Sequence, residues 1–145
     1  MTLVEYKKAL MKFAPIESYA AGMELMGSEV KSLRAKLGSL DGARVLVRGG
    51  EAYLVGMHIP PYQVKNVPGD YDPARTRRLL LKKEEIAALA AAEAKKGLTI
   101  IPLEVYTSGK LIKVRAAVCR GKGKRDRREE IKERDAMREA RRSLA

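Results

Sequence analysis

Arg44-Val45-Leu46-Val47-Arg48-Gly49-Gly50-Glu51-Ala52-Tyr53-Leu54-Val55 is the stretch that decides the fold. Its two halves are rich in valine, leucine and tyrosine, and a pair of glycines separates them. A two-residue Gly-Gly link readily adopts the positive φ angles that a tight hairpin turn requires. The stretch therefore predicts an antiparallel β-hairpin, and residues 57–59 either extend its second strand or begin a neighbouring one.

Further strands are expected on both sides of this hairpin. Residues 13–17 and 19–25 are interpreted as one bent strand, and Pro15 suggests an edge position because proline cannot donate to a ladder. Residues 98–106 and 111–119 are expected to pair around a turn at 107–110, and Pro102 implies a bulge or an edge. Alternation separates the faces of the last strand, with one made of Ile112, Val114, Ala116 and Val118 and the other of Leu111, Lys113, Arg115 and Ala117.

Two helices accompany the predicted strands. The first covers residues 28–37, with Ser28 as its cap and Glu29 beside its positive end. The second covers the alanine-rich residues 82–96 and carries Ile86, Leu89, Ala90 and Glu93 on one side. Residues 1–12 are either a short helix or frayed. Residues 60–78 are interpreted as a loop because of their prolines, and residues 79–81 as an anchor to the core.

These elements predict a mainly β fold, a small OB-like β-barrel with two or three short helices, over residues 1–120. Periodicity alone does not distinguish such a barrel from an open α+β sheet. Residues 121–145 form a basic C-terminal tail, and 17 of the 26 positions from residue 120 onward are charged. The few apolar side chains of the tail bury too little surface to offset the entropy cost of ordering the chain. The tail is therefore expected to be disordered alone and helical when bound.

Composition points to a polyanionic partner. Thirty Lys and Arg against 18 Asp and Glu give a formal charge of +12, which favours nucleic acid first and anionic membrane second. No apolar run approaches the roughly 20 residues of a membrane span, and no signal peptide is apparent. The single Cys119 suits a reducing cytoplasm and, with the single His58, supports no metal site, cofactor or catalytic centre.

Five segments resemble, in order, the motifs of one known family. They are Glu17 to Gly22 (E-S-Y-A-A-G), Gly27 to Arg34 (G-S-E-V-K-S-L-R), Met57 to Tyr62 (M-H-I-P-P-Y), Asp72 to Leu81 (D-P-A-R-T-R-R-L-L-L), and Asp126 to Asp135 in the tail (D-R-R-E-E-I-K-E-R-D). The sequence is similar, from about Lys7 to Arg142, to the SmpB family of tmRNA (SsrA RNA)-binding proteins. It departs from the family pattern at Tyr6, Met11, Gly56, Gly123 and Arg125.

The resemblance implies a non-enzymatic role in trans-translation. In the family, the OB-like domain holds the tRNA-like domain of tmRNA, the tail enters the empty mRNA channel of a stalled ribosome, and elongation factor Tu takes part in delivery. By motif position, Glu29, Leu80 and Lys113 correspond to residues used against tmRNA. Asp126, Arg127 and Arg128 correspond to tail residues near the decoding centre. We expect a cytoplasmic monomer that needs no cofactor.

The expected site combines these positions with nearby cations. The predicted RNA-binding residues are Glu29, Lys31, Arg34, Arg75, Arg77, Leu80, Lys113 and Arg115. The predicted ribosome-binding residues of the tail are Lys122, Lys124, Arg125, Asp126, Arg127, Arg128, Lys132 and Arg134. Simpler interpretations stay open. Glu29 can be a first-turn carboxylate that only stabilises its helix, Leu80 can belong to the core, and Lys113 and Arg115 can belong to a solvated strand face.

Composition fits a second class of protein equally well. A structural ribosomal protein, or another general RNA-binding protein, also combines a small barrel with an extended basic tail. An RNA-modifying enzyme or nuclease is a weaker alternative, because the chain offers neither a paired-carboxylate metal site nor a partner for its one histidine.

Overall fold

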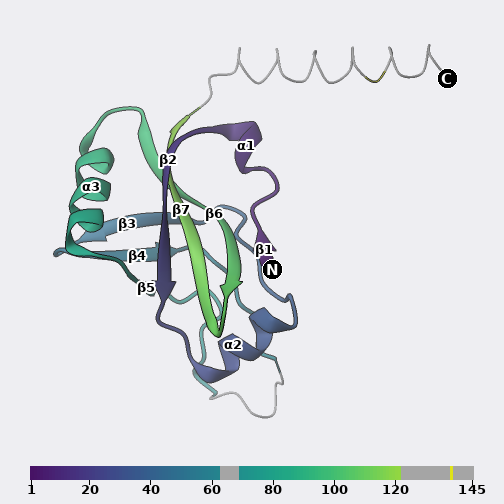
Figure 1. The fold of residues 1–145 in the computed structure, drawn as a ribbon. Helices are drawn as coiled ribbons and strands as arrows, with labels where there is room; N and C mark the ends of the chain where they lie inside the picture. Colours follow the sequence, from purple (N-terminus) through teal and green to yellow (C-terminus); the bar gives the residue numbers. More distant parts are fainter. Residues whose placement is uncertain (63–68, 122–137, 139–145) are drawn as a thin grey trace.

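The computed structural model describes residues 1–62, 69–121 and 138. Within these ranges the chain forms seven strands and three helices (Figure 1). In chain order the elements are β1 (Thr2–Glu5), α1 (Ala9–Lys12), β2 (Phe13–Met23), α2 (Gly27–Arg34), β3 (Arg44–Arg48), β4 (Glu51–Val55), β5 (Arg77–Leu80), α3 (Lys83–Ala94), β6 (Leu98–Ser108) and β7 (Leu111–Gly121).

The strands form a single antiparallel sheet in the order β1-β6-β7-β2-β5-β4-β3. Its two halves meet where β2 pairs with β5 at only two positions, Gly22 and Met23. Figure 1 shows the long strands β2, β6 and β7 running across the direction of β3 and β4. The curled sheet brings β3 into contact with β6, although β1 and β3, its two ends, do not pair. The expected mainly β, OB-like fold with short helices is confirmed, with a sheet that hydrogen bonds do not close.

The Gly-Gly hairpin is confirmed. Strands β3 and β4 pair in register from Arg44 opposite Val55 to Arg48 opposite Glu51, so only two residues form the turn. Gly49 and Gly50 adopt φ angles of +59° and +75°, which is the conformation that a type I′ turn requires. Residues 57–59 do not extend β4, because their contact is an isolated bridge between His58 and Ser39.

The alternation of β7 is confirmed on its inner face. Ile112, Val114, Ala116 and Val118 are all buried, whereas Leu111 on the other face is exposed. That second face is covered farther along, where Ala117 and Cys119 are also buried. Burial raises the pKa of the Cys119 thiol to about 11.

Both strand prolines lie beside register shifts. Pro102 is followed by a shift in the β6–β7 pairing, as predicted. Pro15 precedes a similar shift between β2 and β7. At this point β2 pairs only with β7, since its pairing with β5 begins at Gly22. The proline therefore lies on a locally unpaired edge of an otherwise interior strand.

Three expectations about local structure are wrong. Residues 1–12 were expected to be a short helix or frayed; residues 9–12 do form the short helix α1, but residues 2–5 form β1, which pairs with β6 far along the chain. The first helix begins at Gly27 and ends at Arg34, and the residue at its N-cap position is Met26, so Ser28 is not its cap. Arg77 and Arg78 belong to β5 rather than to a loop, because they pair with Leu54 and Tyr53 of β4.

Helix α3 is attached to the sheet by few contacts. Leu89 is its one fully buried residue, while Ile86, Ala90 and Glu93 on the expected face are partly buried. The Glu93 carboxylate accepts a hydrogen bond from the Val47 amide at 2.8 Å and pairs with Arg48. None of the helices in the described ranges has the length and apolar character needed to cross a membrane.

Candidate nucleic-acid interface

Sheet register places Leu80 and Lys113 in one row across the outer face. Gly22 of β2 pairs with Leu80 of β5 on one side and with Lys113 of β7 on the other. Lys113 in turn pairs with Tyr106 of β6. Directly paired residues of antiparallel strands point to the same face. Two positions that are far apart in the sequence are therefore separated only by a glycine.

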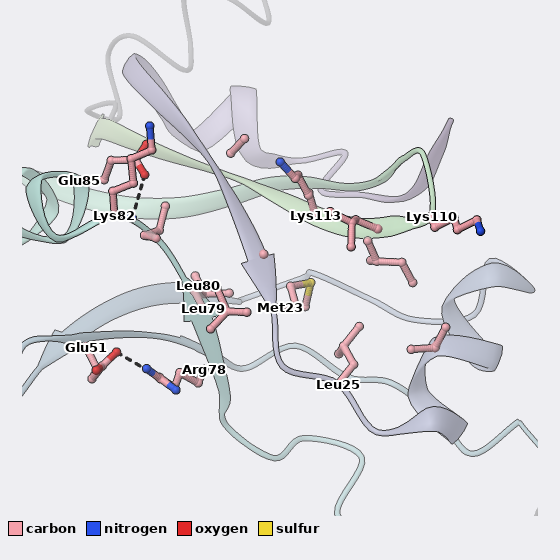
Figure 2. Close-up of a pocket in the computed structure, with 16 residues that line it drawn as sticks. Met23, Leu25, Glu51, Arg78, Leu79, Leu80, Lys82, Glu85, Lys110 and Lys113 are labelled. Carbon is pink, nitrogen blue, oxygen red and sulfur yellow. Dashed lines mark hydrogen bonds and ion pairs between the residues drawn. The ribbon is translucent and has the colours of Figure 1, made fainter.

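A cleft of about 670 Å³ opens beside this row (Figure 2). Its volume lies within the range of roughly 300–1,000 Å³ that is usual for small-ligand sites. Leu80 is 48% exposed at its wall, and Lys113 is partly exposed. The cleft is lined by residues of β2, β4, β5, β7, α2, the start of α3 and the connections next to them: Ala20, Gly22, Met23, Leu25, Val30, Glu51, Arg78, Leu79, Leu80, Leu81, Lys82, Glu85, Lys110, Leu111, Ile112 and Lys113.

Arg115 extends the same outer face by one row. It pairs with Ala20 and Glu104, two residues beyond the pairings of Lys113. The Arg115 Nε donates a hydrogen bond to the Glu104 carboxylate at 3.3 Å, and its guanidinium carbon lies 5.4 Å from the centre of the Tyr106 ring. Arg115 is therefore held against an aromatic face by a cation–π contact as well as by an ion pair.

Helix α2 contributes two exposed cations, Lys31 and Arg34. The Arg34 Nη2 donates to the backbone carbonyl of Lys110 at 3.2 Å. This contact ties the end of α2 to the turn between β6 and β7. The same stretch of α2 lines a shallow hollow together with the exposed Tyr62.

Glu29 lies at the centre of a buried ion-pair cluster at the start of α2. Its carboxylate oxygen Oε2 accepts hydrogen bonds from the Arg77 Nε at 2.8 Å, the Arg75 Nε at 3.1 Å and the Tyr71 hydroxyl at 3.2 Å. Its Oε1 accepts from the Met26 amide at 2.8 Å and from Arg75. The carboxylate therefore replaces the missing side-chain cap of the helix.

Arg77 completes this cluster from the strand side. Its guanidinium donates to the carbonyls of Met57 at 2.8 Å, Pro73 at 2.9 Å and Arg75 at 3.0 Å, in addition to Glu29. A buried charge is tolerated when it is paired and all its donors are satisfied. The cluster consequently joins α2, β5 and the segments around residues 57–59 and 71–75.

The cluster keeps Glu29 ionised. Burial by itself raises the pKa of Glu29, but hydrogen bonds from Arg75, Met26 and Arg77 outweigh burial and hold the pKa below its ordinary value of 4.5. Burial also raises the pKa of Tyr71, and the nearby Glu29 carboxylate adds to that rise. The tyrosine therefore remains a neutral hydrogen-bond donor.

Not all predicted site residues lie at the surface. The side chains of Glu29 and Arg77 have no exposed area, and that of Arg75 is 30% exposed. Leu80, Lys113, Arg115, Lys31 and Arg34 have at least partly accessible surfaces. The structure thus separates the predicted set into an accessible group and a buried group, with Arg75 between them.

Comparison with protein-family models gives a match to the SmpB protein family over residues 3–145. The chain belongs to the SmpB family. The matched residues include every segment that carried the resemblance in the sequence.

Relatives named SsrA-binding protein align with nearly the whole chain. The protein of Microcystis aeruginosa is 39% identical over 142 residues, covering 98% of this chain and 92% of the relative. That of Elusimicrobium minutum is 47% identical over 133 residues, covering 92% and 84%. That of Salinispora tropica is 46% identical over 133 residues, covering 92% and 83%.

A solved SmpB structure has the same fold. It is described as "tmRNA-SmpB: a journey to the center of the bacterial ribosome", and its chain matches with a TM-score of 0.71 at 37% identity. The match covers 86% of this chain and 87% of that one. The two SmpB chains therefore share one architecture, a curled sheet with short helices.

The eight predicted SmpB tail residues, from Lys122 to Arg134, lie outside the described residues, and Arg138 is the described position beyond them. Their role stays a prediction. His58, the single histidine, is exposed. Among the residues with described positions, no three His, Cys, Asp or Glu side chains gather closely enough to hold a metal ion.

Sequence patterns missed two members of the SmpB site. Tyr71 belongs to the cluster around Glu29, but an isolated tyrosine in a proline-rich segment carries no signal of such a partner. Lys110 was expected only as a turn residue, yet it lines the cleft and accepts the hydrogen bond from Arg34. The strand order β6-β7-β2-β5 and the hydrogen bond from Arg34 place this turn beside the cleft and α2.

Proposed function

We propose that this protein binds the tRNA-like domain of tmRNA and brings it to stalled ribosomes during trans-translation. The observation that carries the proposal is the row in which Gly22 joins Leu80 to Lys113 beside an open cleft. We name tmRNA as the RNA because of family membership, since the relatives are named SsrA-binding proteins. The role is binding and positioning rather than catalysis.

The chemistry of the face suits a folded RNA. Lys113, together with Lys31 and Arg34 of α2, offers cations to phosphate oxygens, which supply most of the affinity for nucleic acid. Leu80 offers an apolar surface on which an unstacked base can pack. A formal charge of +12 adds long-range attraction to the whole molecule.

We assign different tasks to the two groups of predicted site residues. The accessible residues contact RNA, whereas Glu29 and Arg77 position α2 and β5 from below. Arg75 contributes to both tasks, because it pairs with Glu29 and keeps some exposed surface. Glu29 therefore serves RNA binding through the geometry of the face and not through direct contact.

The remaining parts of the function rest on the family resemblance. We propose that the protein acts in the cytoplasm as a monomer and that elongation factor Tu joins the delivery complex. We also propose that residues 121–145 are disordered alone, become helical when bound, and enter the empty mRNA channel of the ribosome. The tail cations and Asp126 are the proposed contacts there.

A gel-shift titration tests the choice of RNA. We expect the protein to bind the tRNA-like domain of tmRNA much more tightly than ordinary tRNA at moderate salt. Lys113→Gln should weaken this binding and reduce the log–log salt slope by about 0.7–0.9, the contribution of one phosphate contact. Equal affinity of the wild-type protein for both RNAs would refute the proposed function.

Sedimentation with ribosomes addresses the structural alternative. A rescue factor should leave ribosomal subunits during a high-salt wash, because its contacts are mainly electrostatic. A structural ribosomal protein should stay in the washed subunits. Retention of this protein after the wash would therefore favour the second class.

A further inference from the structure

A second, smaller pocket lies between α1 and the strands β1 and β6. It shares no lining residue with the cleft, and Figure 1 shows α1 and β1 on the side of the molecule away from α3. Its volume is about 240 Å³, below the roughly 300–1,000 Å³ of sites that hold a whole small ligand. A space of this size suits one or two side chains of a partner.

The walls of this pocket are apolar. Leu103 lies at the bulge where the pairing of β6 with β7 shifts register, and the Tyr6 amide donates to the Leu103 carbonyl at 2.9 Å. This hydrogen bond holds the chain that leads into α1 against the bulge. Ala9, which is buried, and Leu10, which is 60% exposed, complete the walls. The pocket therefore combines a buried apolar floor with an accessible apolar edge.

Carboxylates form the rim of the pocket on the side of the sheet. Glu5 of β1 pairs in register with Glu104 of β6, and Glu104 pairs with Arg115 of β7. Directly paired residues of antiparallel strands point to the same face, and like charges placed in this way destabilise a sheet. The Arg115 Nε and the Thr2 hydroxyl both donate to the Glu104 carboxylate, at 3.3 and 3.2 Å. Glu104 is therefore compensated from one side.

Glu5 has no such compensation. It is exposed, and across the described ranges no cation lies within ion-pair distance of its carboxylate. The exposed Lys7, Lys8 and Lys12 follow it in the sequence but do not line the pocket. A protein of formal charge +12 thus keeps an uncompensated negative charge here. The carboxylate repels a phosphate group, whereas a cation would relieve its repulsion from Glu104.

We propose that this pocket docks a protein segment of the stalled ribosome that carries an apolar side chain next to a lysine or arginine. The apolar side chain packs against Leu10 and Leu103, and the cation lies beside Glu5. Proteins bound to RNA are rich in lysine and arginine because they neutralise phosphates, so a ribosome offers such segments. The inference rests on the proposed function, which brings this protein to ribosomes, and adds a contact with protein to those with RNA.

The sign of a charge effect tests the proposal. The probe is a preparation of purified ribosomes stalled on an mRNA without a stop codon. Glu5→Gln raises the net positive charge, so attraction to RNA alone would leave ribosome affinity unchanged or raise it. The proposed contact instead predicts a loss of about threefold, with binding to the tRNA-like domain of tmRNA not weakened. Glu84→Gln is the matched control, because Glu84 is exposed on α3 outside the pocket.

Unfolding does not explain such a loss. Glu5→Gln removes the repulsion between paired carboxylates, so urea unfolding should show no decrease in stability. A Glu5→Gln protein that binds stalled ribosomes as tightly as Glu84→Gln, or more tightly, would overturn the proposal.

The apolar wall has a test of its own. Leu10→Ala should weaken ribosome binding by about fivefold, because it removes most of an exposed apolar side chain from the contact. Ile16→Ala is the control, since Ile16 is 54% exposed and does not line the pocket. Equal ribosome affinity of these two variants would count against the pocket.

Photocrosslinking identifies the class of partner. A full chain with Leu10→p-benzoylphenylalanine, irradiated on stalled ribosomes and digested with RNase, should give an adduct with a ribosomal protein. Mass spectrometry should place the adduct in a segment that contains lysine or arginine beside an apolar residue. An adduct with ribosomal RNA alone, or no adduct, would refute docking to protein.

The outcomes separate this proposal from the proposed function. If the wild-type protein binds stalled ribosomes and tmRNA while Glu5→Gln and Leu10→Ala bind ribosomes like their controls, the docking proposal is refuted and the proposed function stands. If the wild-type protein does not bind stalled ribosomes, the proposed function itself fails.

Discussion

Glu29 and Arg77 are the two charged residues that the described part of the chain buries completely. An isolated charge in such a place would cost several kcal/mol, but every donor and acceptor of the pair is engaged. The carboxylate also binds the Met26 amide at the start of α2. A single side chain therefore fixes both the helix and the strand that carries Leu80.

Glu29→Gln should destabilise the protein by about 3–5 kcal/mol, because it leaves the buried Arg77 without its counter-charge. Urea unfolding measures the loss. Glu24→Gln is the matched control: Glu24 pairs with Arg78 at the surface, where a salt bridge contributes only about 0–1 kcal/mol. A Glu29→Gln protein that is as stable as the wild type and still fails to bind RNA would contradict the positioning role.

The same cluster should make stability depend on acid. The pKa of Glu29 in the folded protein is lowered from its ordinary value of 4.5. Its stabilisation is therefore fully present above that ordinary value and is lost as pH falls through the folded pKa. Urea midpoints measured from about pH 6 to about pH 3 should fall more steeply for the wild type than for Glu29→Gln. Parallel curves would contradict this prediction.

At the scale of elements, two short connections organise the sheet. The β3–β4 hairpin turns in two residues, and β2 meets β5 at only two positions. The cleft lies on the outer face beside this short β2–β5 pairing. The β6–β7 turn closes the other side of the cleft, and α2 holds that turn through Arg34.

Gly50→Ala tests the first of these connections. Gly50 has a φ angle of +75°, which costs a residue with a Cβ about 1–2 kcal/mol. Thermal melting should therefore show a lower Tm for Gly50→Ala. Gly27→Ala should leave the Tm unchanged or raise it, because no atom lies within 4 Å of the added Cβ and helices favour alanine. Equal melting of the two variants would contradict the turn assignment.

At the scale of the whole molecule, the accessible cations face more than one region. Lys31, Arg34, Lys110 and Lys113 gather around α2 and the β6–β7 turn. The predicted tail adds a separate group of charges that follows β7 in the sequence. The proposed function assigns the first group to tmRNA and the second to the ribosome.

We expect Asp126→Ala with Arg127→Ala to leave tmRNA binding intact and to block tagging on stalled ribosomes. The reason is that the proposed tmRNA face lies entirely within residues 1–120. Gel-shift titration measures tmRNA binding, and an in vitro tagging assay measures tagging on stalled ribosomes. Lys113→Gln, in contrast, should weaken tmRNA binding. Loss of tmRNA binding in the tail double variant would overturn this division of tasks.

Local chemistry determined much of this fold. The positive φ angles required by Gly49-Gly50, the alternation along β7 and the bulge after Pro102 follow from backbone and side-chain preferences over a few residues. The ordered family motifs identified the relatives for the same reason, since they are read directly from the chain. These features needed no knowledge of distant neighbours.

Only tertiary structure decided which side chains meet. Glu29 and Arg77 are 48 positions apart, and Gly22 and Lys113 are 91 positions apart, so no local pattern reports their contacts. Burial is the reason for the positioning role that we propose for Glu29, because two arginines enclose its carboxylate. The sequence by itself determined the β3–β4 hairpin, the β6–β7 pair, the charge and the family. Long-range strand pairing decided the accessible face, since it alone brings Leu80, Gly22 and Lys113 into one row.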